Sequence, residues 1–73
     1  MKRDYVLENR IFEFREELGF SQAHLAKLVG ISRNALSLIE LGKIGCSAYV
    51  AARLCVVLHT SFDDLFFLVP KRL

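Results

Sequence analysis

Hydrophobic residues recur at helical spacing through most of the chain. At the head of the chain the spacing is i, i+4, i+7 and i+11, which places four side chains on one face of a helix that ends at Gly19. Those four residues are Leu7, Ile11, Phe14 and Leu18. Asp4 and Asn9 both suit the N-cap of this helix, and the pattern leaves that choice open. Strand-type alternation of any length is absent from the sequence, so the pattern predicts an all-α fold.

Serine and glycine residues divide the rest of the chain into four further short helices. Each is expected to begin after a serine, because the serine oxygen accepts hydrogen bonds from the first turn's free N–H groups. The caps and their helices are Ser21 with 22–29, Ser32 with 33–41, Ser47 with 48–58, and Ser61 with 62 to about 68. Gly30 and Gly42 are placed to end the second and third helices. Asp64 gives the last helix a shortened capping box, and Pro70 limits its extension.

The second and third helices are joined by three residues only, Gly30-Ile31-Ser32. A link this short, with glycine first and an apolar residue in the middle, forces a steep crossing angle, which is the geometry of a helix-turn-helix unit. We expect Ile31 to fill the core from the turn. The side chains expected to be buried are Leu25, Ala26, Leu28 and Val29 on the second helix and Ala35, Leu36 and Ile39 on the third.

Size and composition narrow the class of protein. The chain has 73 residues, which is enough for one domain with a marginal core, yet 53% of them are hydrophobic. This excess favours an oligomer that covers apolar surface. Apolar runs such as 54–58 are too short to cross a membrane. Acidic residues interrupt the start of the chain, where a signal peptide would be apolar, so we expect a cytoplasmic protein.

Residues suited to catalysis or metal binding are few. Cys46, Cys55, His24 and His59 lack the paired spacing of a zinc site, so we expect free, buried thiols and neither metal nor cofactor. A disulfide is disfavoured in a reducing cytosol. The sequence shows neither a Ser-His-Asp arrangement nor a glycine-rich phosphate loop, which argues against an enzyme. The net charge of +2 is too small for a non-specific DNA coat but is compatible with a specific binder.

Two segments carry a family resemblance: NRIFEFREELGFSQAHLAKLVGISRNALSLIELGK and SAYVAARLCVVLHTSFDDLF, which together span 9–66. The specific part is FSQAHLAKLVGISRNALSLIELGK, with its Ser-Gln start, its glycine turn and its Ile-Glu-x-Gly ending. With these residues the chain resembles the Cro/repressor-type, or XRE-like, helix-turn-helix family. The resemblance implies an all-α, five-helix, lambda-repressor-like domain over 1–73, with the helix-turn-helix unit at 21–42. It also implies that a homodimer binds operator DNA and regulates transcription.

The resemblance places Arg33, Asn34 and Ser37 on the recognition helix, whose side chains meet base edges. A helical wheel puts the three on one outward face near the N-terminal half, which enters the major groove in this docking mode. Asn pairs bidentately with adenine and Arg with guanine. Arg33 as a phosphate clamp, or Arg33 and Asn34 as ordinary solvated residues, are alternatives that the sequence leaves open. Leu38, on the same side, is placed to touch a thymine methyl group or a sugar.

Contacts to the DNA backbone are expected from four residues near helix ends. The resemblance assigns them to Gln22, which opens the second helix, and to Lys43, which follows the third. The free N–H groups and the dipole of a helix N-terminus attract a phosphate. We add Ser32 and Lys27, although Lys27 equally suits the solvated side of the second helix.

Glu40 is expected to have a structural role. It lies at the edge of the apolar stripe of the third helix, and an acid facing DNA would repel phosphate. Arg15 and Glu40 resemble the family's ion pair between the first and third helices. His24 is expected at the surface. His59 stands where the family often has glycine, so we expect left-handed backbone there.

Several positions that are usually polar in the family are apolar here, among them Leu41. The fourth helix is apolar nearly all round, and Phe66 to Val69 form an apolar run before Pro70. We therefore expect dimerisation elements in 48–73, with contacts from Tyr49, Val56, Phe66, Phe67, Leu68 and Val69. The run at 66–69 could instead pair as a short strand with 4–7.

The sequence is compatible with two functions. The first is a small repressor or autoregulator of a phage, plasmid or mobile element, which binds a near-palindromic operator in double-stranded DNA. The second is a protein-interaction module or antitoxin on the same fold, favoured by the apolar residues Leu41, Tyr49 and Val56. Neither requires a membrane or a small-molecule ligand.

Overall fold

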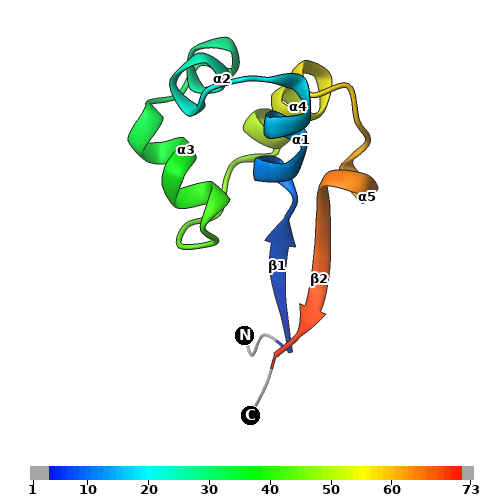
Figure 1. Ribbon diagram of the computed structural model, residues 1–73. Coiled ribbons are helices and arrows are strands. Elements are labelled where there is room, and N and C mark those ends of the chain that lie inside the picture. The colour runs from blue at the N-terminus through cyan, green and yellow to red at the C-terminus, as the bar shows by residue number, and fades with distance from the viewer. Residues whose placement is uncertain (1–3, 72–73) are drawn as a thin grey trace.

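The computed structural model describes residues 4–71 and contains five helices and one two-stranded sheet over that range. The elements are β1 (Tyr5–Asn9), α1 (Ile11–Leu18), α2 (Gln22–Val29), α3 (Arg33–Glu40), α4 (Ala48–Val57), α5 (Phe62–Leu65) and β2 (Phe66–Pro70). The helices form a rounded body, from which the antiparallel strands β1 and β2 project side by side (Figure 1). We call this pair of strands the stem.

All five helices contribute to the core of the body. Its buried apolar residues are Ile11, Leu25, Ala26, Val29, Leu36, Ile39, Ala51, Leu54, Leu58, Leu65 and Phe66. Ile31 is half-buried and packs against this core from the α2–α3 turn, as predicted. Leu28 was predicted in the core and is exposed, because it lies at the margin of the apolar stripe of α2. Within 4–71 the structure holds no helix long and apolar enough to cross a membrane.

The four serine caps are confirmed. Each serine oxygen accepts a hydrogen bond from the backbone N–H three residues later, at 3.0 to 3.1 Å, in Ser21, Ser32, Ser47 and Ser61. Gly30 and Gly42 have φ angles of +89° and +73°, and His59 has +56°, so the predicted left-handed positions are also correct. The helices α2, α3 and α4 lie within one residue of their predicted ends.

The first predicted helix is wrong at its beginning. Leu7 was assigned to the apolar face of that helix, but it lies in β1, and α1 begins only at Ile11. Of the two candidate caps, Asn9 lies next to the helix start, and its Oδ1 accepts the N–H of Ile11 at 3.1 Å. The N-cap position itself is occupied by Arg10, whose side chain makes no capping bond.

The all-α prediction is corrected by the stem. The last helix was expected to reach about residue 68, but α5 ends at Leu65 and the chain continues as β2. The alternative of a strand pair is the correct one, with Leu7 opposite Leu68 and Asn9 opposite Phe66. The run Phe66 to Val69 contains two aromatic residues and a β-branched one, which are residue types that favour strands.

Candidate nucleic-acid interface

The turn between α2 and α3 fixes how α3 is presented. The N–H groups of Gly30 and Ile31 both donate to the carbonyl of Ala26, at 2.9 and 3.0 Å, which closes the end of α2. The chain then reverses through the left-handed Gly30, and the next helix starts after Ser32. As a result α3 lies at the outside of the body, away from α5 and β2 (Figure 1).

Four of the predicted DNA-contacting residues come together in the folded chain. Gln22, from the first turn of α2, lines a shallow hollow of about 300 Å³ with Arg33, Asn34 and Ser37 of α3. Arg33 and Asn34 are exposed, whereas Gln22 and Ser37 are half-buried. No acidic side chain lines the hollow. The site therefore offers amide, hydroxyl and guanidinium groups, all able to donate hydrogen bonds.

The other predicted contacts lie on the same unit or directly after it. Lys27 on α2 and Lys43 beyond α3 are exposed, and the N–H of Lys43 donates to the carbonyl of Leu38 at 2.9 Å. Leu38 itself is half-buried, so only part of its side chain is available to a ligand. The Ser32 oxygen accepts the N–H of Ala35 as a cap, which leaves its O–H free to donate to a phosphate oxygen.

A buried ion pair joins α1 to α3. Arg15 donates from Nε to Oε2 of Glu40 at 2.9 Å and from Nη2 to Oε1 at 3.1 Å. The two side chains are only 9% and 7% exposed. Arg15 also donates from Nη1 to the carbonyl of Phe20 at 3.0 Å. The hydrogen bond with Glu40 raises the pKa of Arg15, against the opposing effect of burial, so the guanidinium stays protonated.

Sequence reasoning missed that Gln22 belongs to this network. Its Nε2 donates to Oε1 of Glu40 at 3.3 Å, so Glu40 receives bonds from both α1 and α2. One carboxylate thus ties three helices together beside the hollow. The position of Gln22 at a helix start indicated a phosphate contact, but no sequence pattern indicated the long-range bond to Glu40.

Asn9 makes a second link that the sequence did not reveal. Its Nδ2 donates to the carbonyl of Ile39 at 3.0 Å, while its Oδ1 accepts the N–H of Ile11. The end of β1, the start of α1 and the end of α3 are therefore held by one amide side chain. The only signal in the sequence was the suitability of Asn9 as a cap.

The two cysteines are half-buried and the two histidines are exposed. Cys46 and Cys55 are free and half-buried, and burial raises the pKa of both thiols. His24 is exposed and lies edge-on to the ring of Phe20. Over residues 4–71 no three His, Cys, Asp or Glu side chains are grouped in a way that could hold a metal ion.

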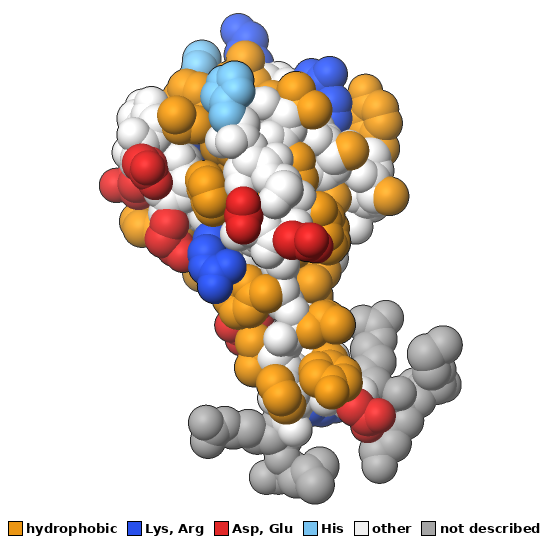
Figure 2. Space-filling view, turned by 90° about the vertical axis from the view of Figure 1, so that its right-hand side faces the viewer, with side chains coloured by type: hydrophobic (Ala, Val, Ile, Leu, Met, Phe, Trp, Pro, Cys, Tyr) orange, Lys and Arg blue, Asp and Glu red, His pale blue; other side chains and the backbone are white. Residues whose placement is uncertain are grey.

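The charge at the hollow suits an anionic ligand. The lining of the hollow contains Arg33 and no carboxylate. The face seen in Figure 2, turned away from α3, carries both acidic and basic side chains among hydrophobic ones.

The residues predicted for a dimer interface differ in how far they are exposed. Tyr49 and Val56 are 70% and 74% exposed on the outer face of α4. Leu68 is exposed, and Phe67 and Val69 are half-buried. Phe66 is only 4% exposed and belongs to the core, so its assignment to an interface is wrong. It is buried because the first residue of β2 lies against the helical body, where it stacks on Phe62.

Comparison with known proteins agrees with this geometry. The helix-turn-helix family model matches residues 11–65. An HTH-type transcriptional regulator of Archaeoglobus fulgidus is 37% identical over 60 residues, which cover 82% of this chain and 86% of the relative. The regulator YgzD of Bacillus subtilis is 31% identical over 62 residues, which cover 85% and 94% of the two chains.

Solved structures show the same fold. The N-terminal DNA-binding domain of SinR from Bacillus subtilis is 31% identical with a TM-score of 0.67, over 73% of this chain and 78% of that one. The clp gene regulator ClgR from Corynebacterium glutamicum is 30% identical with a TM-score of 0.70, over 74% of this chain. The present chain covers only 57% of ClgR. The chain belongs to the XRE-like helix-turn-helix family of transcriptional regulators.

Proposed function

We propose that this DNA-binding domain recognises a specific site in double-stranded DNA as a homodimer and acts as a small repressor or autoregulator. The hollow between Gln22 and the first turns of α3 is the observation that supports this most strongly. It brings Arg33, Asn34 and Ser37 together in one hollow whose lining contains no carboxylate. A promoter of a phage, plasmid or mobile element is the class of target that we favour.

In the proposed complex the N-terminal half of α3 enters the major groove. Asn34 is exposed and presents an amide that pairs bidentately with adenine, and Arg33 presents a fork that fits guanine. Ser37 lies one turn later and is half-buried, so its hydroxyl reaches only a base that comes close to the helix. Leu38 contributes an apolar edge suited to a thymine methyl group.

Phosphate contacts position α3 without reading sequence. The first turn of α2 offers free N–H groups beside Gln22, and Lys43 offers an ammonium directly after α3. Lys27 and Ser32 are secondary candidates for such contacts. Arg15 and Glu40 act indirectly, because their bond holds α3 at a fixed orientation against α1.

A homodimer suits both the DNA and the protein. Two copies related by a two-fold axis present two recognition helices about 34 Å apart, which matches a near-palindromic operator. Exposed apolar residues on α4 and on the stem are candidates for the interface of such a dimer. We propose no catalytic step and no cofactor, in keeping with relatives named as transcriptional regulators.

A second candidate function is a protein-interaction module or antitoxin on the same fold. The exposed Tyr49 and Val56 favour it, because a large aromatic and a valine on one helix face resemble the centre of a protein interface. An antitoxin would combine this surface with DNA binding. The outer face of α4 is the part of the structure that would carry the second activity.

A gel-shift titration against the DNA upstream of the gene that encodes this chain tests the first function. We expect specific binding at moderate salt and relaxed discrimination at one base pair in Asn34→Ala, at a cost of about 1–3 kcal/mol. Asp63→Ala, which removes an exposed polar side chain from α5, is the matched control and should bind like the parent. Equal affinity for random DNA, or equal loss in both variants, would contradict the proposal.

A further inference from the structure

Most of the stem is exposed to solvent. Both of its strands leave the helical body, and hydrophobic side chains continue down it (Figures 1 and 2). Tyr5, Val6, Leu7 and Leu68 are all exposed, which leaves on the order of 400 Å² of apolar surface in water. A two-stranded sheet is marginally stable alone, and it is stabilised by further strands or by packing against a helix. The Phe66 end of the stem packs against the helical body, and a further strand would stabilise the exposed remainder.

Hydrogen bonds at the two ends of the stem fix the direction in which each backbone group points. The N–H of Arg10 donates to the carbonyl of Leu65 at 2.8 Å, and the N–H of Lys71 donates to the carbonyl of Asp4 at 2.9 Å. In an antiparallel pair, bonded and non-bonded positions alternate along each strand. The even-numbered residues of β1 therefore bond across to β2, and the odd-numbered residues point their N–H and C=O groups outward.

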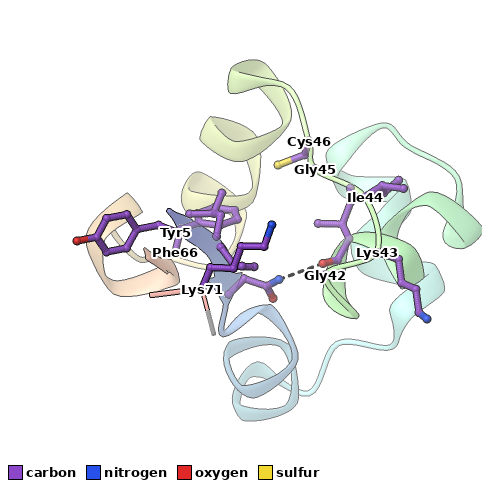
Figure 3. Close-up of a pocket in the computed structure, with 12 residues that line it drawn as sticks. Tyr5, Gly42, Lys43, Ile44, Gly45, Cys46, Phe66 and Lys71 are labelled. Atoms are coloured by element: carbon purple, nitrogen blue, oxygen red, sulfur yellow. Dashed lines mark hydrogen bonds between the residues drawn. The ribbon is translucent and has the colours of Figure 1, made fainter. Parts of the chain in front are cut away.

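The outer edge of β1 is open to another strand. It presents the N–H and C=O groups of Tyr5, Leu7 and Asn9, which have no backbone partner within residues 4–71. Two clefts follow this strand. The larger, about 340 Å³, separates β1 from the loop at 42–46 (Figure 3), and the smaller, about 280 Å³, separates it from the end of α3. Both leave room beside β1.

The outer edge of β2 is closed by comparison. Its outward positions are Phe66, Leu68 and Pro70. The N–H of Phe66 already donates to the carbonyl of Phe62, and proline has no N–H. Leu68 is left as the single N–H donor on that edge over 66–70. A proline at an outward position is the usual way in which a protein blocks an edge strand.

We propose that β1 pairs antiparallel with β1 of a second copy of this chain, so that the two stems form one four-stranded sheet. The charged residues that flank β1 favour this occupant. With Leu7 opposite Leu7 of the second copy, Asp4 before β1 lies opposite Arg10 after it, and this attractive pair occurs twice. In the single chain the exposed Arg10 side chain lies over the ring of Phe67 and donates to the carbonyl of Asp64 at 3.3 Å, so it turns towards Asp4 in the dimer. The register centred on Val6 would set Asp4 against Glu8, which is repulsive. Self-pairing thus satisfies three outward donors and defines its own register.

This inference rests on the homodimer of the proposed function, and it identifies β1 as the surface through which the two copies contact each other. The two-fold axis runs through the stem, so the helical bodies lie at opposite ends of the joined sheet. It excludes Tyr49 and Val56 from the dimer contact and leaves the α4 face available for another partner.

The test compares two proline variants on cross-strand neighbours. Leu7 and Leu68 face each other in the stem, are 46% and 62% exposed, and both point their N–H groups outward. Each substitution removes one leucine and one outward donor and keeps the bonds between β1 and β2. Sedimentation analysis without DNA should show that Leu7→Pro raises the dimer dissociation constant by about tenfold or more, whereas Leu68→Pro leaves it unchanged.

Equal effects of the two variants, or a parent chain that stays monomeric at about millimolar concentration, would overturn the assignment. If Leu7→Pro fails to fold, amide hydrogen exchange in the parent chain replaces it. The Leu7 amide should then be protected more strongly as concentration rises, while the Leu68 amide should not change; equal behaviour of the two amides overturns the assignment. These measurements contain no DNA, so they fail or succeed independently of the gel shift.

Discussion

The bond between Arg15 and Glu40 gives the clearest quantitative prediction about stability. Glu40→Leu leaves the Arg15 guanidinium, whose side chain is 9% exposed, without its two charge-assisted hydrogen bonds. Removing one member of a buried pair costs about 3–5 kcal/mol, because the remaining charge stays out of water without its main partner. Arg15 would keep only the carbonyl of Phe20 and the exposed carboxylate of Glu16. In a domain of this size 1 kcal/mol corresponds to about 4–8 °C, so the melting temperature should fall by about 12 °C or more.

The chain provides its own control for this experiment. Arg15 also lies 3.5 Å from Oε2 of Glu16, whose side chain is 59% exposed. Glu16→Gln removes a carboxylate from the same cation, but a solvated pair contributes about 0–1 kcal/mol. Glu40→Leu and Glu16→Gln should therefore separate clearly when unfolding is followed by circular dichroism in urea and during heating.

A double variant tests the cause of the loss. Arg15→Met combined with Glu40→Leu removes both charges, so the cost of an unpaired buried cation disappears. We expect the double variant to be more stable than Glu40→Leu alone, with a coupling energy of about 2 kcal/mol. A loss below about 1 kcal/mol in Glu40→Leu, or strictly additive single effects, would refute the reasoning.

Three further predictions follow from the same structure. Asn9→Ala removes the side-chain bonds that join α1 to α3 and should cost about 1–2 kcal/mol in urea unfolding; an unchanged midpoint would contradict this. Burial raises the pKa of the Cys46 and Cys55 thiols above the ordinary 9.0, so their contribution to stability is complete below pH 9 and is lost as pH rises through the raised values. Urea titrations should show this fall in the parent and a smaller one after Cys46→Ala with Cys55→Ala; equal falls would contradict it. Lys43→Gln should lower the salt slope of DNA binding by about 1 without changing specificity, whereas Lys71→Gln on the stem should not; equal slopes would contradict the phosphate contact.

Local signals in the sequence predicted the helical body well. Serine caps and glycine ends act within three or four residues, so Ser21, Ser32 and Gly30 define their helices without reference to the rest of the fold. Hydrophobic spacing likewise predicted the buried face of α3, where Leu36 and Ile39 lie in the core. Leu28 was misplaced because the margin of a stripe is buried or exposed according to the neighbouring helix, which the local pattern does not specify.

The stem could not be predicted in the same way, because its two strands lie at opposite ends of the chain. Leu7 stands four residues before Ile11, and this spacing fits a helix face as well as it fits a strand followed by a helix. The decisive interaction is the pairing of Leu7 with Leu68, which no local window contains.

The candidate site was predicted in part. Gln22, Arg33, Asn34 and Ser37 were named from the sequence, and the structure places them around one hollow. The link from Gln22 to Glu40 was not foreseen, since it depends on how far one side chain reaches in three dimensions. The base or phosphate that each residue meets stays a prediction.

In vitro selection from a pool of random DNA duplexes tests the central proposal most directly. We predict enrichment of a near-palindromic site whose half-sites lie about one helical turn apart, bound at least about 10³-fold more tightly than random DNA. Repeating the selection with Asn34→Ala should relax one position in each half-site and leave the spacing unchanged. A pool that shows no enriched sequence, with binding that depends on salt alone, would contradict specific recognition by the residues of this hollow.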